Sequence, residues 1–299
     1  LYFVYDTQKR YLYNIQQLVM TLQSIKEAPI KKGTNVLIRV DFNLTMDGER
    51  IVDDFRIRRA IKSIEFVLQK KGRVRILSHR GRPNGLYQEA FSMRRIAHHF
   101  RRIIGEKVLF VTDPTDDRLF AECSSVPEII FFENLRFWPG EESNNLIFAK
   151  LLARWGNVYI NEAFSNSHRK HASMVMISKL LPAFAGFDVL QEVAQLQKIF
   201  QHPKRPLVAI LGGAKMSTKM PLIRRFLKEA DTVLVGGAIA NTIFYMQGFE
   251  VGESIVEKNA DEIIKSSTIR NKKLHLPIDV VVTTALENER APVMNMRHV

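Results

Sequence analysis

Short runs rich in β-branched residues alternate with stretches of helical periodicity from Gly33 onward. The clearest helix is predicted over residues 56–71, where apolar side chains recur at the spacing of one helix face and Asp53 and Asp54 precede its start as capping residues. Such alternation is typical of βαβ units on a mostly parallel sheet, so the pattern predicts an α/β fold. The strands expected in the first half cover residues 36–40, 73–77, 107–111, 129–132 and 158–160.

A second series of the same kind follows residues 180–188, a stretch that contains Pro182 and Gly186 and is typical of a domain junction. A chain of 299 residues is also long for a single core. We therefore expect two doubly wound parallel-sheet, Rossmann-like domains: an extension over 1–19, an N-terminal domain over 20–182 and an incomplete C-terminal domain over 183–299. The second domain is expected to contain helices at 189–200, 220–230, 239–246 and 257–267 and strands at 207–211, 232–235 and 278–282.

Composition narrows the class of protein. Hydrophobic residues make up 46% of the chain and charged residues 25%, which is ordinary for a soluble globular protein. Apolar stretches fall short of the roughly 18 residues that span a bilayer, and the single cysteine, Cys123, cannot form an intramolecular disulfide. Because the N-terminus also lacks a secretory signal pattern, we expect a cytoplasmic protein, with residues 1–19 as an extension before Met20.

Positive charge is concentrated in the first part of the chain. Residues 1–182 hold 29 Lys and Arg against 19 Asp and Glu, a net charge of +10, whereas residues 183–299 have a net charge of +3. This excess predicts an anionic partner, either a nucleic acid or a small phosphorylated metabolite. Composition alone leaves both open.

Polar residues directly follow several of the expected strands. Ligands of open α/β sheets bind beyond the carboxyl ends of the strands, so these residues are the first candidates for a site. Arginine and imidazole groups there suit a ligand with carboxylate and phosphate, while Asp41 and Asn43 could take its hydroxyl groups. Taken singly, each Arg could be a solvated surface charge and His79 a locally bonded loop residue, but four loops of one kind weaken that interpretation. The candidates are Asp41, Asn43, Arg56, His79, Arg82, Glu133, Asn134, Arg136, His168 and Arg169.

Small residues also follow two strands of the second half. Gly212, Gly213 and Ala214 precede Lys215, and Lys219 lies one helical turn further on. Small residues let the backbone approach a phosphate closely, and the start of a helix favours its charge. The string is not a Walker loop, because the P-loop pattern is missing. Gly236 and Gly237 follow the next strand, where a plain βα turn explains them equally well.

Seven strings in register make a stronger case, and together they closely resemble the phosphoglycerate kinase family from about Ser24 to the end of the chain. They are RVDFN at 39–43, FRIRRA around Arg56, SHRGRP at 78–83, ENLRF at 133–137, NEAF with HRKH at 161–171, LGGAK at 211–215 and LPIDVVV at 276–282.

The resemblance implies a glycolytic and gluconeogenic enzyme that transfers a phosphoryl group between 1,3-bisphosphoglycerate and ADP, giving 3-phosphoglycerate and ATP. It implies a monomer that uses Mg²⁺ with the nucleotide, and a hinge near residues 182–192 whose closure excludes water. Arg56 and Lys215 would neutralise the phosphoryl group in flight. The implied triose ligands are Asp41, Phe42, Asn43, Arg56, His79, Arg80, Gly81, Arg82, Arg136 and Arg169. The implied nucleotide contacts are Gly212, Gly213, Ala214, Lys215, Lys219, Gly236 and Gly237, with no metal ligand in the chain.

Three features depart from the family pattern. Arg80 stands where a hydrophobic residue is usual, and Ser165 replaces a glycine, so the loop that carries Arg169 is expected to bend differently. The GGGD-type and GPxGxFE-type segments that complete the family's nucleotide and metal site do not occur before Val299. We therefore expect the chain alone to bind the triose without kinase turnover.

Two alternatives remain open at this stage. One is a catalytically inactive remnant that binds triose phosphate. The other is a basic nucleic-acid-binding protein, which is disfavoured because the sequence has no helix-turn-helix, zinc ligand set or RNA-binding strand motif.

Overall fold

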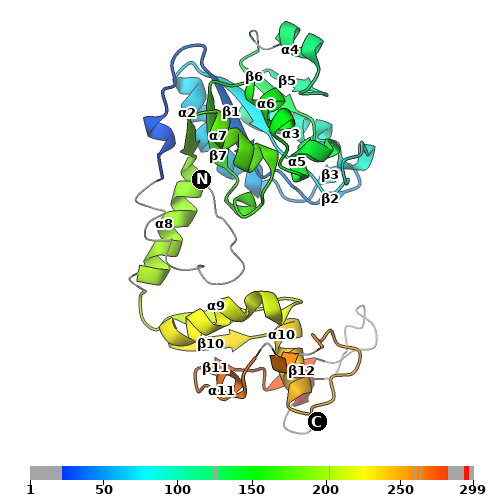
Figure 1. The fold of residues 1–299 in the computed structure, drawn as a ribbon, viewed down its shortest axis with the longest axis vertical. Helices are drawn as coiled ribbons and strands as arrows, with labels where there is room; N and C mark the ends of the chain where they lie inside the picture. The colour runs from blue at the N-terminus through cyan, green and yellow to red at the C-terminus, as the bar shows by residue number, and fades with distance from the viewer. Residues whose placement is uncertain are drawn as a thin grey trace. The chain divides into compact units, whose positions relative to one another are not determined.

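The computed structural model describes residues 22–123, 125, 127–201, 203–258, 260–262, 264–281 and 293–295. The chain divides into two compact units, Leu1–Gln197 and Lys198–Val299, which Figure 1 traces from blue to red. Both contain parallel strands connected by helices, so the predicted α/β class is confirmed. The extension expected over residues 1–19 lies outside the described residues.

Six parallel strands form the sheet of the first unit, in the order β5-β6-β4-β1-β7-β8. β1 lies inside the sheet and pairs with both β4 and β7, so that Val36 is opposite Val74 on one side and Val158 on the other. Strands β4, β5 and β6 lie on one side of β1, and β7 and β8 lie on the other, and such a reversal of strand order is where α/β sheets bind ligands. The strands are β1 (Asn35–Val40), β4 (Arg73–Leu77), β5 (Val108–Val111), β6 (Ile129–Phe132), β7 (Val158–Glu162) and β8 (Ala183–Ala185).

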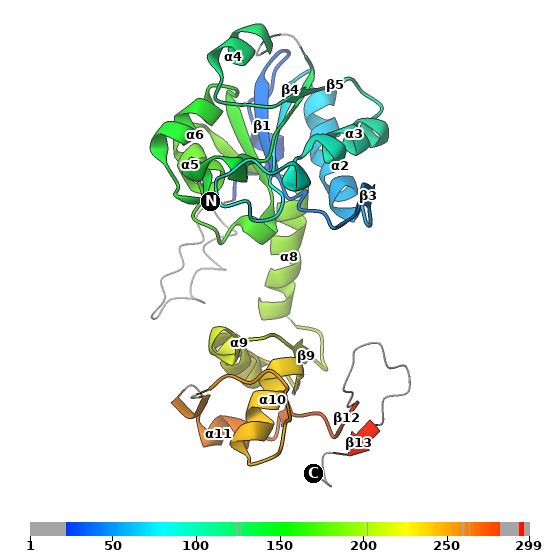
Figure 2. The same ribbon diagram turned by 90° about the vertical axis from the view of Figure 1, so that its right-hand side faces the viewer.

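Helices cover both faces of this sheet, as Figure 2 shows with α2 and α3 on one side and α5 and α6 on the other. Side chains of β1 alternate between the two faces: Val36 and Ile38 pack in the core with α2 and α3, whereas Leu37 packs in the core that contains Trp155. By the same alternation Arg39 lies on the side of Leu37, and it is fully buried.

The first unit contains the following helices and short elements, the last of which, α8, continues past the unit's end at Gln197. They are η1 (Ile25–Glu27), β2 (Met46–Asp47), β3 (Arg50–Ile51), α2 (Phe55–Gln69), η2 (Glu89–Phe91), α3 (Arg94–Ile104), α4 (Asp117–Cys123), η3 (Leu135–Phe137), α5 (Pro139–Glu142), α6 (Leu146–Ala153), η4 (Phe164–Asn166), η5 (Ala172–Met176), α7 (Ile177–Leu180) and α8 (Phe187–Gln201).

Helix α2 forms where the apolar periodicity predicted it, but its start is held differently. The backbone N–H of Phe55 donates to Asp53 Oδ1 at 2.8 Å. Asp54 makes no side-chain cap, because its carboxylate accepts hydrogen bonds from Arg58 at 2.8 and 2.9 Å. One of the two expected capping residues therefore serves an ion pair along the helix instead.

The boundary between the units lies after Gln197, later than the expected boundary at residue 182. Strand β8 belongs to the first sheet, where it pairs with β7. The first turn of α8 is tied to the same unit, because Glu162 Oε1 accepts from the backbone N–H of Asp188 at 3.1 Å. Residues 183–197 therefore fold with the first unit.

A parallel sheet of three strands, in the order β11-β10-β9, forms the centre of the second unit. Its core joins Val233 of the middle strand to Ile223 of α9 and Ile243 of α10. Strand β9 is at the edge of this sheet, and its side chains Val208 and Ile210 are 48% and 77% exposed. The elements are β9 (Val208–Leu211), α9 (Met216–Glu229), β10 (Thr232–Val235), α10 (Gly237–Met246), η6 (Ala260–Glu262), α11 (Ser266–Ile269), β11 (Leu274–His275), β12 (Asp279–Val281) and β13 (Val293–Asn295).

Two predictions for the second unit need correction. The helix expected over residues 257–267 is wrong, because the described residues there form only the short turns η6 and α11. Glu257 instead lies in a loop, and its backbone N–H donates to Thr242 Oγ1 at 3.0 Å. The strand expected over residues 278–282 exists as β12, but it pairs antiparallel with β13 rather than extending the parallel sheet, and residue 282 lies outside the described residues.

Candidate active site

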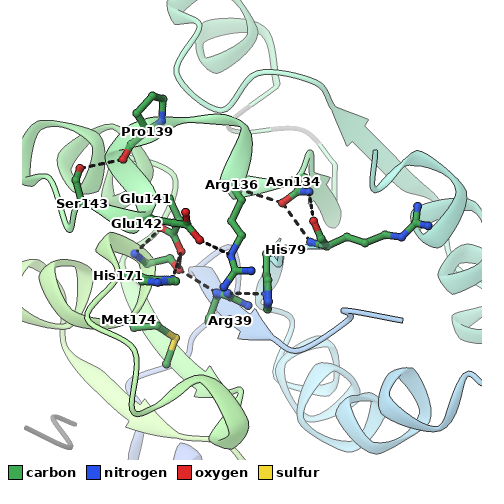
Figure 3. Close-up of polar contacts among 12 residues, drawn as sticks. Arg39, His79, Asn134, Arg136, Pro139, Glu141, Glu142, Ser143, His171 and Met174 are labelled. Carbon is green, nitrogen blue, oxygen red and sulfur yellow. Dashed lines mark hydrogen bonds and ion pairs between the residues drawn. The ribbon is translucent and has the colours of Figure 1, made fainter. Parts of the chain in front are cut away.

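The carboxyl ends of β1, β4, β6 and β7 bring arginine and histidine side chains together in the first unit. Arg39 is on β1, His79 follows β4, Arg136 is in η3 after β6, and His171 follows β7. Figure 3 shows these four side chains pointing toward one another. The sequence placed two of them, His79 and Arg136, in the site.

His79 is almost fully buried, and its Nδ1 lies 3.0 Å from Nη2 of Arg39. Burial, followed by the positive charges of Arg39, Arg136 and Arg169, holds the pKa of His79 far below its ordinary value. The imidazole is therefore neutral around pH 7.

Arg136 is 3% exposed and is aimed into the site by its neighbours. Its backbone N–H donates to Asn134 Oδ1 at 3.1 Å, and its Nη1 donates to the carbonyl of Gly81 at 2.6 Å. Nε and Nη2 complete no hydrogen bond within the described structure, although Glu142 Oε1 lies 3.2 Å from Nε. Buried donors without partners are uncommon, so Nη2 is available to an oxyanion, whereas Nε faces the Glu142 carboxylate.

The loop after β7 adds a further cation. Arg169 is half-buried, and its Nε is a buried donor without a hydrogen-bond partner among the residues described. Burial and then the charges of Arg136 and Arg39 lower the pKa of His171 to about 4. Burial and then Arg169 lower the pKa of His168 as well. The positive charge of this site at neutral pH therefore comes from arginine, and its histidines are neutral.

Asp41 and Asn43 extend the site along the loop after β1. Asp41 Oδ2 accepts from Arg56 Nη1 at 2.7 Å and from Ser165 Oγ at 2.5 Å. Asn43 Oδ1 accepts from the backbone N–H of Gly81 at 3.0 Å, which ties the first two loops together. Ser165 lies in a 3₁₀ turn, a conformation that needs no glycine, so the structure accommodates the replacement and gives its hydroxyl a contact with a candidate ligand residue.

Phe42 differs from the other predicted triose residues. It is fully buried, and its ring lies 6.1 Å from the rings of both Phe100 and Phe131. Its backbone N–H donates to Ser78 Oγ at 3.0 Å. The Phe42 side chain therefore belongs to the core beneath the site.

The loop after β4 depends on a glycine and an amide. Gly81 has a φ of +60°, and a Cβ there would lie 2.3 Å from ring carbons of Phe91, so a side chain does not fit. The Asn134 amide binds both backbone groups of Arg80, the residue before Gly81. Its Oδ1 accepts from the Arg80 N–H at 3.2 Å, and its Nδ2 donates to the Arg80 carbonyl at 2.7 Å. The Arg80 side chain is half-buried, while Arg82 is exposed.

A pocket of about 230 Å³ opens beside Arg56 in the first unit. Arg59, one helical turn further along α2, bridges the carboxylates of Asp188 and Glu192 on α8. Glu162 also lines the pocket, and burial raises the pKa of its carboxyl to about 7. The pocket combines both signs of charge, unlike the arginine cluster around Arg136.

In the second unit the predicted glycines lie at the ends of β9 and β10. A Cβ at Gly212, Gly236 or Gly237 would meet no atom within 4 Å, so the backbone is open to a ligand there. Lys215 is the N-cap of α9, and Lys219 follows on the same helix. Both lysines and Ala214 are exposed, as are Gly212 and Gly213.

The start of α9 already holds an anionic group. Glu257 accepts from the backbone N–H of Ser217 at 2.9 Å and from its hydroxyl at 2.5 Å. These hydrogen bonds lower the pKa of the Glu257 carboxyl, so it is ionised and complements the helix dipole. A phosphate near this loop would therefore depend on lysine side chains and open backbone more than on the free end of the helix.

No group of three or more His, Cys, Asp or Glu side chains among the described residues could hold a metal ion. No helix within the same residues has both the length and the apolar character needed to cross a bilayer.

The first unit is an α/β domain with arginine side chains at the carboxyl ends of its strands, and the second unit has a parallel sheet with open glycine loops after two strands. A family model described as phosphoglycerate kinase matches residues 25–299, and the chain belongs to that family. The family consists of kinases, and the resemblance noted in the sequence is thereby confirmed.

Several relatives agree with this assignment. The chain is 37% identical over 270 residues to phosphoglycerate kinase of Coprothermobacter proteolyticus. The aligned region covers 88% of this chain and 68% of the relative. The chain is 40% identical over 253 residues to the enzyme of Moorella thermoacetica, covering 83% and 64% respectively. The chain thus spans about two thirds of the length of these relatives.

Solved structures show the same fold. Phosphoglycerate kinase from Coxiella burnetii superposes with a TM-score of 0.72 at 33% identity, covering 92% of this chain and 71% of that one. The structure of the Pyrococcus horikoshii enzyme gives a TM-score of 0.76 at 22% identity, which supports the fold.

Proposed function

We propose that this chain takes part, as a cytoplasmic monomer, in reversible phosphoryl transfer between 1,3-bisphosphoglycerate and ADP, giving 3-phosphoglycerate and ATP, and that its first unit supplies the triose site. The observation that carries the proposal is Arg136, a buried guanidinium whose Nη2 has no hydrogen-bond partner among the described residues, set with neutral His79 at the carboxyl ends of parallel strands. A small ligand with carboxylate and phosphate groups supplies the acceptors that these donors need.

The triose would bind in the first unit. Arg136 and Arg169 supply charge to its oxyanions, and His79 supplies a neutral donor. Asn43 is free to donate from its amide to a hydroxyl group, because only its oxygen is bonded to Gly81. The residues Arg80, Gly81 and Arg82, in the loop after β4, would lie beside the bound triose.

The transfer needs positioning and positive charge more than a base. During the reaction the bond from phosphorus to the acyl oxygen breaks, and a bond from phosphorus to a β-phosphate oxygen of ADP forms. Charge gathers on the equatorial oxygens of the group in flight, where Arg56 and Lys215 would neutralise it. Lys219 and the open glycines of the second unit would hold the nucleotide phosphates.

In this proposal Mg²⁺ binds together with the nucleotide. Proteins commonly bind it through one or two carboxylates together with substrate phosphates. In such an arrangement the nucleotide phosphates would supply part of its coordination. The roles derived above therefore rest on the side chains alone.

Calorimetric titration of the chain with 3-phosphoglycerate tests the proposal. Binding should weaken as salt concentration rises, because it is largely an attraction between charges. Arg136→Ala should weaken it by at least about tenfold, since a charge-assisted hydrogen bond is lost. Exposed Arg101 on α3 provides the matched control, and Arg101→Ala should bind as the wild type does. Salt-independent affinity, or an Arg136→Ala variant that binds normally, would contradict the proposed site.

A further inference from the structure

A continuous chain of hydrogen bonds leads from a buried carboxylate to His79. Glu141 of α5 is completely buried, and its Oε1 accepts from Ser173 Oγ at 2.6 Å while its Oε2 accepts from the backbone N–H of Ser173 at 2.9 Å. Ser173 Oγ in turn accepts from Arg39 Nε at 2.9 Å. Arg39 Nη2 lies 3.0 Å from His79 Nδ1. Figure 3 shows Glu141, Arg39 and His79 in this arrangement.

The polarity of each link follows from the chemistry of its members. A guanidinium can only donate, so Ser173 Oγ must accept from Arg39 and its own proton is left for Glu141. For the same reason His79 Nδ1 must be the acceptor at the far end. A neutral imidazole that accepts at Nδ1 carries its proton on Nε2.

The Arg39 guanidinium is fixed in its orientation by hydrogen bonds from all of its nitrogens. Besides Ser173 and His79 it donates from Nη1 to the carbonyl of Val40 at 2.5 Å, so each nitrogen of its guanidinium has an acceptor. The residue is fully buried, as are Ser173 and Glu141. These links come from β1, α5 and the π-helical turn η5, which are remote from one another in the sequence.

We propose that Glu141 is a positioning residue that acts through Ser173 and Arg39 to fix His79 as the neutral tautomer with its proton on Nε2. Among the described residues the His79 ring is hydrogen-bonded at Nδ1, so the proton on Nε2 is available to an acceptor on a ligand. That the ligand is the triose rests on the proposed function; the tautomer itself does not.

The groups around His79 and Glu141 favour this state over a broad pH range. His79 faces Arg39, Arg136, Arg169 and His171, all of which oppose a charged imidazole. Burial raises the pKa of the Glu141 carboxyl, while Arg39, the two Ser173 donors and Arg136 act in the opposite direction, and His171 Nδ1 lies 3.8 Å from Oε1. His79 should therefore keep one tautomer while ordinary histidines titrate.

Nuclear magnetic resonance of the ¹⁵N-labelled, ligand-free chain tests the tautomer directly, with the His79 signals assigned from a His79→Gln variant. Long-range proton–nitrogen spectra should show a protonated Nε2 and an unprotonated Nδ1 for His79 from about pH 5.5 to about pH 8. A proton on Nδ1, or a His79 that titrates within this range, would overturn the inference.

Two variants test whether Glu141 acts through the relay. Ser173→Ala and Glu141→Gln should each raise the share of the minor tautomer about fivefold relative to the major one, the size expected for the loss of one hydrogen bond. Ser178→Ala, which removes a hydroxyl bonded to the Val175 carbonyl outside the relay, should leave the spectrum unchanged. Folded Ser173→Ala protein with the wild-type tautomer ratio would refute the role of Glu141.

Addition of 3-phosphoglycerate separates this inference from the proposed function. The His79 Nε2 proton should shift on binding, and affinity should fall about fivefold in Ser173→Ala. If the ligand leaves the spectrum unchanged while the free protein shows the fixed tautomer, the proposed triose site fails and the relay stands.

Discussion

Arg56 donates from Nη1 to Asp41 Oδ2 at 2.7 Å, so a candidate transition-state residue is paired with a candidate triose residue in the absence of ligands. The pair is only partly buried, since the side chains are 49% and 14% exposed. Exposed pairs of this kind contribute about 1 kcal/mol or less to stability. Asp41 therefore serves to orient Arg56 more than to stabilise the fold.

Removal of Arg56 should damage turnover far more than triose binding. In protein that catalyses the proposed transfer, Arg56→Ala should lower kcat by roughly three orders of magnitude, because charge on the phosphoryl group in flight is left unneutralised. Arg56→Lys should restore only part of this, since an ammonium lacks the planar fork. Steady-state kinetics and calorimetry with 3-phosphoglycerate measure the two effects separately, and equal losses in both would rule out a role specific to the transition state.

Lys219 should matter for the nucleotide and not for the triose. Lys219→Ala should weaken ADP binding about tenfold at low salt, since one charge-assisted contact to a phosphate is lost. Alanine suits the interior of α9, so the helix should be retained. Lys228, exposed near the other end of α9, gives the control variant Lys228→Ala. Unchanged ADP affinity in Lys219→Ala would remove Lys219 from the nucleotide site.

Local sequence patterns predicted the strands well because buried parallel strands are short, continuous apolar runs. Residues 73–77, 129–132 and 232–235 match β4, β6 and β10 at both ends. The helix expected over residues 257–267 failed for a tertiary reason, since Glu257 is engaged by Thr242 and by the start of α9. Apolar spacing alone does not register such contacts.

The sequence identified some residues of the candidate site and missed others. Positions after strands identified Arg136 and Arg169, because topology brings those loops together. Arg39 was missed, since it lies within a strand and only the alternation of buried side chains could have shown that it points inward. Glu141 and Ser173 have no local signature, because their contact spans 32 residues of sequence.

Glu162 should make the stability of the first unit depend on pH. Burial raises the pKa of its carboxyl from the ordinary 4.5 to about 7, so the folded state prefers the neutral form. The contribution is therefore full below about pH 4.5 and declines as pH rises through about 7, by at most about 3 kcal/mol. Chemical denaturation at several pH values should show this decline in the wild type but a smaller one in Glu162→Gln.

Exposed Glu122 on α4 supplies the control for that experiment. Glu122→Gln should follow the wild-type pH profile. If the profiles of wild type and Glu162→Gln run parallel from about pH 5 to about pH 8, the Glu162 carboxyl does not titrate as the structure indicates.

Gly186 should be intolerant of any side chain, because of the same carboxyl. A Cβ at Gly186 would lie 1.6 Å from Glu162 Oε2, and Glu162 cannot easily move while Oε1 holds Ser63 Oγ at 2.6 Å and the Asp188 N–H at 3.1 Å. Gly186→Ala should lower the free energy of unfolding by about 1–3 kcal/mol through overpacking. Gly212, where a Cβ meets nothing within 4 Å, gives the control variant Gly212→Ala.

A double-mutant cycle identifies the clash as the cause of that loss. In Glu162→Ala the obstructing carboxyl is gone, so adding Gly186→Ala should cost much less there than in the wild-type background. Denaturant unfolding of the two single variants and the double variant measures this coupling. Additive losses would mean that the approach of the Glu162 carboxyl is not the cause of the destabilisation.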